Sequence, residues 1–310
     1  MKPLLCGLVV LALFASTIEP GHADYRFTTL NVPGAATTVA TDIKGGQIVG
    51  YHETPLTDAF HGFLFSEGSY SSFDVPGSAG TAGYGVNSAG QIVGFYLDSS
   101  FRNRGFLRTG NDYTAIDVPG AINTRAEGIN TAGQITGFYQ MSAGLPPHGF
   151  LFSNGNYVSI DLPGSIDTVS SRINNVGQIV GTYEDAALRI HGFLRTGDAY
   201  TTLDFPGAVL TEAFGINNVG QIVGMYSMTT GTHGFLYSDG NYSTFDVPGA
   251  VFSEAFGIDD LGEIVGEYAA TDSGPIQGFL ATPTPTPSSL LLLAVGAACL
   301  LGQACWRRRR

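Results

Sequence analysis

The chain has 310 residues, and 26 acidic against 14 basic side chains give it a net charge of −12. This acidic balance argues against nucleic acid, or any other polyanion, as a simple electrostatic partner. The three cysteines, Cys6, Cys299 and Cys305, lie near the two ends, so no disulfide holds the region between them.

Residues 1–23 have the pattern of a secretory signal peptide. A basic start at Lys2 precedes an apolar run over 4–14, and a small-x-small triplet ending at Ala23 forms a cleavage site. The alternative is a membrane anchor, but the apolar run is short for a membrane span. We therefore expect cleavage after Ala23 and export of the chain that follows.

Residues 24–281 contain six copies of one repeat. Gly-Gln-Ile-Val-Gly, His-Gly-Phe-Leu and Pro-Gly recur in fixed order with small variations, and successive copies lie about 43 residues apart. A period of that length is typical of a four-stranded propeller blade. The region is rich in Gly, Thr, Ser, Tyr and Phe and shows no helical period, so we expect strands rather than helices.

Each repeat divides into four short strands. In the fifth copy we expect them at 213–217, 221–226, 234–238 and 242–246, where β-branched and aromatic residues suit a pleated surface.

Two turns lie between strands of the repeat, and a third follows its last strand. Asn-Asn-Val-Gly at 217–220 puts Asn at the turn start and Gly where a positive φ is needed, and Asp-Gly at 239–240 marks a second hairpin turn. Pro-Gly at 248–249 ends the fourth strand, because Pro cannot donate to a central ladder.

The two ends of the repeat region complement each other. The chain enters at 27–34 with a segment that matches only a fourth strand, and it leaves after 278–280 with one that matches only a third strand. The sequence therefore predicts an all-β, six-bladed β-propeller of four-stranded blades, with its last blade closed by the N-terminal strand. The alternatives are an open solenoid, which would want capping repeats, and a five- or seven-bladed ring closed by a domain-swapped partner.

Residues 282–310 differ in character from the repeats. Pro alternates with Thr in a stiff linker over 282–289. The apolar run 290–306 is long enough, at about 1.5 Å per residue, to cross a thin bilayer. Four arginines follow it, so we predict a transmembrane or sorting segment over 290–310 with the arginines in the cytoplasm and the repeats outside. Without the two ends, which hold five basic residues and one acid, the repeats carry −16.

The repeat markers, together with Phe-Asp-Val-Pro-Gly, resemble those of the HAF family of extracellular repeat proteins. The tail resembles a PEP-CTERM sorting signal, with a proline motif, a short span and an arginine cluster. Within Pro285-Thr286-Pro287, Thr286 stands where that family has Glu. The resemblance implies a Gram-negative bacterium that makes exopolysaccharide, a cell-surface or secreted product, and exosortase, a membrane protease, as the processing partner. It implies no characterised activity.

Two residue types recur in most copies and are candidates for chemistry. We expect the histidines to hydrogen-bond a neighbouring blade rather than to form a metal-binding ring. A blade has at most one of them, so neighbouring histidines would be far apart, and two blades have none. We expect the aspartates to cap the Pro-Gly turn rather than to act as acid catalysts. The histidines are His61, His148, His191 and His233, and the aspartates are Asp74, Asp117, Asp161, Asp204 and Asp246.

The most variable segments lie between the second and third strands of each repeat. In a ring all six emerge on one face, beside the loops after Pro-Gly, and this face is the predicted binding surface. Glu184 and Asp185 are adjacent, and we favour a solvated loop over a catalytic or metal-binding pair because adjacent side chains usually point apart. The candidate binding residues are Asp58, Arg102, Arg104, Glu184, Asp185, Arg189 and Asp272, together with Glu53.

The sequence holds no nucleophile elbow, zinc-protease motif, phosphate loop, EF-hand or Cys-x-x-Cys pair. We therefore predict a non-catalytic cell-surface or extracellular-matrix protein that binds a glycan or a protein, needs no metal or other cofactor, and reaches the membrane through its tail. The alternative is a secreted hydrolase or lyase that acts on polysaccharide. An enzyme would show unlike acids and bases converging at one channel mouth, whereas a scaffold would show a featureless channel.

Overall fold

The computed structural model describes residues 25–55 and 59–284. One compact unit spans Tyr25–Pro283. Within the described residues, no helix is long and apolar enough to cross a membrane. Outside them lie the predicted signal peptide, the apolar tail, and the candidate residues Ala23, Asp58, Pro285, Thr286 and Pro287.

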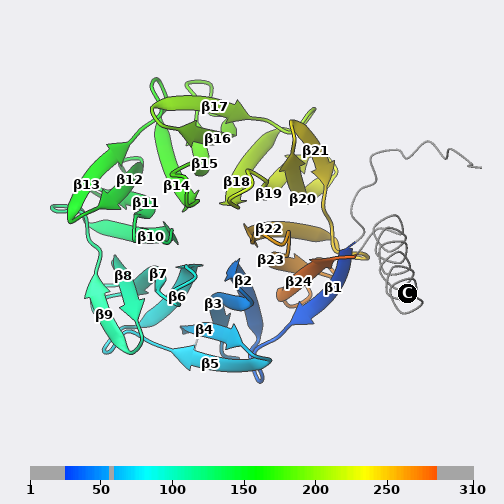
Figure 1. The fold of residues 1–310 in the computed structure, drawn as a ribbon, viewed down its shortest axis with the longest axis horizontal. Helices are drawn as coiled ribbons and strands as arrows, with labels where there is room; N and C mark the ends of the chain where they lie inside the picture. The colour runs from blue at the N-terminus through cyan, green and yellow to red at the C-terminus, as the bar shows by residue number, and fades with distance from the viewer. Residues whose placement is uncertain (1–24, 56–58, 285–310) are drawn as a thin grey trace, which may run out of the picture. The chain divides into compact units, whose positions relative to one another are not determined.

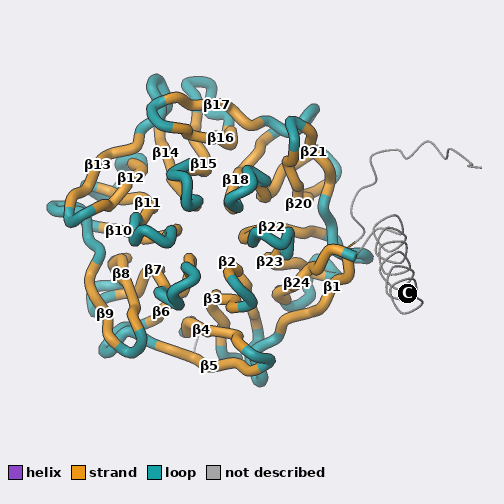
Figure 2. Tube along the Cα trace, viewed as in Figure 1, coloured by secondary structure: helices purple, strands orange, loops and turns teal. Residues whose placement is uncertain are grey.

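Six antiparallel sheets of four strands surround a central axis (Figure 1). The described part contains strands and loops (Figure 2). We number the blades 1 to 6 by their innermost strands, which are β2 (Thr37–Lys44), β6 (Gly80–Val86), β10 (Asn123–Ile129), β14 (Asp167–Ile173), β18 (Leu210–Ile216) and β22 (Phe252–Ile258). The second strands are β3 (Gln47–Glu53), β7 (Ile92–Leu97), β11 (Ile135–Gln140), β15 (Ile179–Glu184), β19 (Ile222–Met228) and β23 (Ile264–Ala269). The third strands are β4 (Phe60–Ser66), β8 (Asn103–Thr109), β12 (His148–Ser153), β16 (Ile190–Thr196), β20 (Gly231–Ser238) and β24 (Gln277–Pro283). The outermost strands are β5 (Ser69–Phe73), β9 (Asp112–Ala115), β13 (Asn156–Ile160), β17 (Ala199–Leu203), β21 (Asn241–Thr244) and β1 (Tyr25–Leu30).

The last blade is closed as the sequence predicts. Strand β1 pairs with β24 in antiparallel register, from Tyr25 opposite Pro283 to Leu30 opposite Gly278. The sheet order is β1-β24-β23-β22, so the two ends of the described chain meet in one blade (Figure 1). This pairing occupies the outer edge of β24, which would otherwise be open to another strand.

In blades 2 to 5 the turn between the first and second strands begins with Asn and has a Gly with positive φ, as predicted. In blade 5 the Asn217 side-chain oxygen accepts the Gln221 N–H at 2.9 Å, and Gly220 has φ of 85°. The same side chain also donates to the Asp259 carbonyl of the next blade at 2.9 Å. Equivalent bonds join blade 2 to 3, 3 to 4 and 4 to 5. The turn asparagine therefore links neighbouring blades as well as capping its own turn.

The core of each blade is built around the phenylalanine of the His-Gly-Phe-Leu marker. All six of these rings are at most 1% exposed, and each belongs to a strand that is third in its sheet. Gly224, at the end of the Gly-Gln-Ile-Val-Gly marker, lies against the Phe235 ring and the Glu212 carbonyl, and a Cβ there would collide with both. The Gly-Gln-Ile-Val-Gly and His-Gly-Phe-Leu markers therefore recur together because the last glycine of one packs against the phenylalanine of the other.

Candidate functional site

The recurring histidines and aspartates form pairs within single blades. In the four blades that have both, Nδ1 of the histidine lies 2.8 to 3.2 Å from a carboxylate oxygen of the aspartate 13 positions later. The expectation that these histidines bond a neighbouring blade is therefore wrong. The reason is that the third strand and the end of the fourth strand lie side by side in one sheet.

The Pro-Gly turns are capped by a different residue from the one expected. The hydroxyl of Thr81 accepts the Val75 N–H at 3.0 Å, and a Thr or Ser holds the same place in the other blades. Turn capping by the recurring aspartates is therefore also corrected, because their carboxylates are engaged with the third strand. In blade 2, where Arg104 replaces the histidine, Asp117 accepts the Gly105 N–H at 3.1 Å.

The loop candidates on the predicted binding face are spread over several blades. In blade 4 the Asp185 carboxylate accepts the N–H groups of Ala187 and Arg189 and lies 3.3 Å from His191 Nε2. The N–H of Arg189 lowers the pKa of Asp185. Asp185 thus holds its own loop in shape, which agrees with the solvated-loop interpretation.

Blade 2 repeats this design with Asp98, which accepts the Ser100 and Arg102 N–H groups and pairs with Arg104 Nε at 3.0 Å. In the other candidate positions, Asp272 is exposed, and Glu184 is half-buried at the end of β15. The structure does not gather these residues into one site, and a ligand role for them stays a prediction.

A different set of residues does converge, on the propeller axis. Each innermost strand is interrupted by a β-bulge where it pairs with the second strand. A bulge leaves its extra residue outside the ladder and turns that side chain away from the sheet. The residues at the bulges are Thr41, Tyr84, Glu127, Ser171 with Arg172, Phe214 and Phe256, and all of them line one cavity of about 390 Å³. We call it the axial cavity.

The second strands supply further walls of the axial cavity. Tyr51 and Phe138 add aromatic rings, and Thr182 adds a hydroxyl. The rings of Phe214 and Phe256 lie 5.2 Å apart, and those of Tyr51 and Tyr84 are stacked at 6.3 Å. The cavity therefore combines broad aromatic faces with a few hydroxyl and carboxyl groups.

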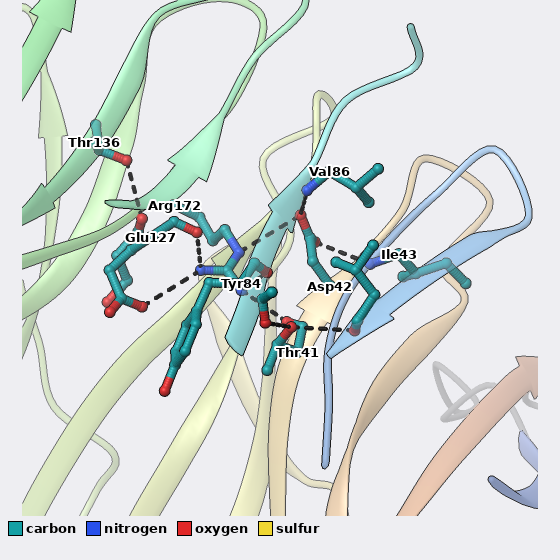
Figure 3. Close-up of polar contacts among 11 residues, drawn as sticks. Thr41, Asp42, Ile43, Tyr84, Val86, Glu127, Thr136 and Arg172 are labelled. Carbon is teal, nitrogen blue, oxygen red and sulfur yellow. Dashed lines mark hydrogen bonds and ion pairs between the residues drawn. The ribbon is translucent and has the colours of Figure 1, made fainter. Parts of the chain in front are cut away.

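Arg172 lines the axial cavity, and Figure 3 shows its guanidinium among polar groups of the neighbouring strands. Its guanidinium reaches from blade 4 toward the opposite blade 1. It donates to the carbonyls of Glu127 in blade 3 at 2.6 Å, and of Thr41 in blade 1 and Tyr84 in blade 2 at 2.7 Å. The carboxylates of Asp42 and Glu127 lie 3.7 and 3.9 Å from it. One side chain thus ties four blades together at the axis.

The crowding at this level explains which residues occur there. Arg172 and Asp42 stand where the other four blades have glycine. A Cβ on Gly257 would lie 2.7 Å from the Asp42 Cα, and one on Gly128 would lie 2.9 Å from the Arg172 Cα. Only two opposite blades carry a side chain here, and the two side chains interact.

Three more carboxyl groups lie on the two inner strands of blades 5 and 6, and one of them, Glu212, is on the wall of the axial cavity. Glu212 lines the axial cavity, and Glu254 is directly opposite Glu267 in the β22–β23 ladder. Burial, reinforced by the neighbouring acids, raises the pKa of Glu254 to about 7 and that of Glu267 to about 8. Burial also raises the pKa of Glu212. The described residues provide no hydrogen bond or ion pair to any of these three carboxyl groups.

Sequence reasoning missed this cavity, although a signal was present. The sequence analysis considered departures from the repeat in the loops. The bulge residue, which follows a small residue in every copy, also differs in almost every copy. That position holds Thr41, Tyr84, Glu127, Ser171, Phe214 and Phe256. The axis is therefore not the featureless channel that the sequence analysis expected of a scaffold.

Comparisons with known proteins show the fold. No model of a known protein family matches the sequence, and no curated protein matches it. AofleA from Arthrobotrys oligospora is 13% identical with a TM-score of 0.52, over 83% of this chain and 86% of that one. Virginiamycin B lyase from Staphylococcus aureus is 10% identical with a TM-score of 0.49, over 84% and 100%. A lectin from Aleuria aurantia, in complex with α-methyl-L-fucoside, is 12% identical with a TM-score of 0.47, over 84% and 99%.

Proposed function

We propose that this protein is a non-catalytic binding module that takes one sugar residue of a glycan into the axial cavity. The observation that carries the proposal is the convergence of all six bulge residues on that cavity. These residues differ from blade to blade, so they are not needed merely to repeat the scaffold. The cavity volume of about 390 Å³ lies in the range of small-ligand sites.

The chemistry of the walls fits a sugar. A sugar ring has apolar C–H faces that pack on aromatic rings, and hydroxyls at its edge that need hydrogen-bond partners. Tyr84, Phe214 and Phe256 supply the rings, and Glu127 and Glu212 supply carboxyl oxygens. Arg172 lies next to the turn between the first and second strands, at the end opposite the variable loops, so the sugar would enter from the side of those loops.

A hydrolase acting on polysaccharide is the second candidate, favoured by the buried carboxyl groups near the axis. Glycoside hydrolysis pairs a carboxylic acid of raised pKa with a second carboxylate that stays ionised. Here burial raises the pKa of all four of the acids Glu127, Glu212, Glu254 and Glu267. A set of acids shifted in one direction supports binding better than it supports this division of roles.

We further propose the cellular setting from the sequence motifs. The repeats support membership of the HAF family, and the tail supports PEP-CTERM-type sorting with exosortase as the processing partner. The protein would then act outside the cytoplasm, at the cell surface or in an exopolysaccharide matrix, with its membrane contact confined to the C-terminal segment.

Two matched variants test the axial cavity. Phe256→Ala removes a cavity ring, and Phe101→Ala removes a loop ring that is 75% exposed on the predicted binding face. We expect glycan affinity, measured by calorimetry on the ligand found in a glycan screen, to fall at least tenfold in the first variant and to stay unchanged in the second.

The reverse pattern would move the site to the loops and refute the axial assignment. Circular dichroism of both variants separates lost binding from lost folding. Turnover of the bound glycan by the wild-type protein would favour the hydrolase instead.

A further inference from the structure

We propose that the sugar residue in the axial cavity carries a free amino group, and that its ammonium is held by Glu212, which lines the cavity, and by Glu254, which has the equivalent place in the neighbouring blade 6. The ligand class is thus a glycan with unacetylated amino sugars. This inference rests on the proposed function and names the chemistry of the ligand for the same cavity.

Carboxyl groups near the axis outnumber the cations that could pair with them. The two arginines there are already engaged. Arg172 is bonded to three carbonyls and lies beside two carboxylates, and the Arg125 guanidinium lies over the Phe95 ring, 4.0 Å from its centroid. No cation of the described residues pairs with Glu212, Glu254 or Glu267.

Ionising these three carboxyl groups without a cationic partner costs free energy. A buried carboxylate without a partner is unfavourable, and proteins normally pair it or keep it protonated. Glu254 lies opposite Glu267 in the β22–β23 ladder and has the place in blade 6 that Glu212 has in blade 5, and all three are half-buried. Glu212 opposes the ionisation of Glu254, and Glu254 opposes that of Glu267. Glu53 opposes that of Glu267 as well. A cationic group at this place would relieve the repulsion, so a positively charged ligand gains more here than a neutral one.

The residues around Glu212 suit an ammonium group better than a metal ion. Hard divalent cations take six to eight oxygen ligands, roughly, in a polar cage. The wall beside Glu212 instead holds the rings of Phe214 and Phe256, with Tyr51 and Tyr84 nearby. Aromatic faces attract organic cations through their negative π-clouds. Carboxyls next to aromatic rings therefore suit the ammonium of an amino sugar.

The test compares three probes that differ only at carbon 2 of each sugar. They are the β-1,4-linked trisaccharides of glucosamine, N-acetylglucosamine and glucose, titrated into the full chain by calorimetry at pH 6.5. We expect the glucosamine trisaccharide to bind at least tenfold more tightly than the other two. We also expect added salt to weaken the binding of this probe alone.

Variants assign the preference to the proposed carboxyls. Glu212→Gln and Glu254→Gln should each abolish the preference for the glucosamine probe while leaving the protein folded. Glu67→Gln makes the same change at the exposed turn between β4 and β5, far along the blade from the axis, and should leave the preference intact.

The outcomes separate the two proposals. Equal affinity for all three trisaccharides, with each lost in Phe256→Ala, would overturn the amino-sugar inference and leave the glycan site standing. No binding of any trisaccharide would count against both. Tight binding of Ca²⁺ that is lost in Glu254→Gln would replace the ammonium by a metal ion and overturn the inference.

Discussion

At the scale of single residues, Arg172 has the largest structural role of any side chain on the axis. It is 6% exposed and belongs to blade 4, whereas its partners belong to blades 1, 2 and 3. A buried cation of this kind is tolerated only when carbonyls and carboxylates surround it. Arg172 therefore both lines the axial cavity and connects blades that are far apart in sequence.

Replacing this side chain should be costly. Arg172→Ala would leave the carboxylates of Asp42 and Glu127 buried without their cation, and breaking such a pair costs about 3–5 kcal/mol. We expect a loss of that order in the free energy of unfolding, measured with urea. Arg195→Ala is the matched control, because its partner Asp198 is fully exposed, and should change the urea midpoint little. Equal midpoints for both variants would show that the axial arginine does not hold the blades.

At the scale of elements, the β-bulge is the feature that turns a repeat into a site. The strands and turns were predictable from the alternation of β-branched residues and the Asn-x-x-Gly turns. The bulge was not, because its flanking residues look like an ordinary strand. A one-residue shift in register decides whether Tyr84 or Glu127 points to a neighbouring blade or to the axis.

The same limit applies to the recurring side chains. Their periodic recurrence favoured a structural role for His191 and Asp204, but it could not predict that they pair with each other, because that depends on which strands lie side by side. Thr81 and its equivalents, which cap the Pro-Gly turns, gave no local signal because they lie six residues beyond the N–H groups that they accept.

The β22–β23 ladder makes the stability of blade 6 depend on pH. The carboxyls of Glu254 and Glu267 have pKa values of about 7 and about 8 in the fold, against 4.5 ordinarily. Between those values the folded state binds more protons than the unfolded state, so the free energy of unfolding falls as pH rises from about 5 to 8. The charged groups that act on this pair are Glu212, which faces Glu254, and Glu53, which faces Glu267.

Glu267→Gln should therefore reduce this slope, because one of the titrating groups is gone. We expect the variant to gain stability relative to wild type at pH 8 and to differ little at pH 5, as measured by urea unfolding at both values. A constant difference across the range would mean that Glu267 titrates normally in the fold and would contradict the assigned burial.

At the scale of the whole molecule, ring closure was predictable and the axis was not. The incomplete first and last repeats revealed that β1 must complete the blade of β24, because a missing strand is visible in sequence. Closure brings six bulges around one axis, and no sequence pattern within a single repeat expresses that convergence. Asp42 and Arg172 are 130 positions apart and meet only because blades 1 and 4 face each other across the ring.

The central claim is that the non-repeated bulge residues form the ligand site. The most direct measurement is a crystal structure of the protein with the glucosamine trisaccharide. We predict a sugar ring between Tyr84, Phe214 and Phe256, with its amino nitrogen within hydrogen-bond distance of Glu212 or Glu254. A trisaccharide bound at the variable loops or between the outer strands, with the axial cavity holding only water, would contradict the account.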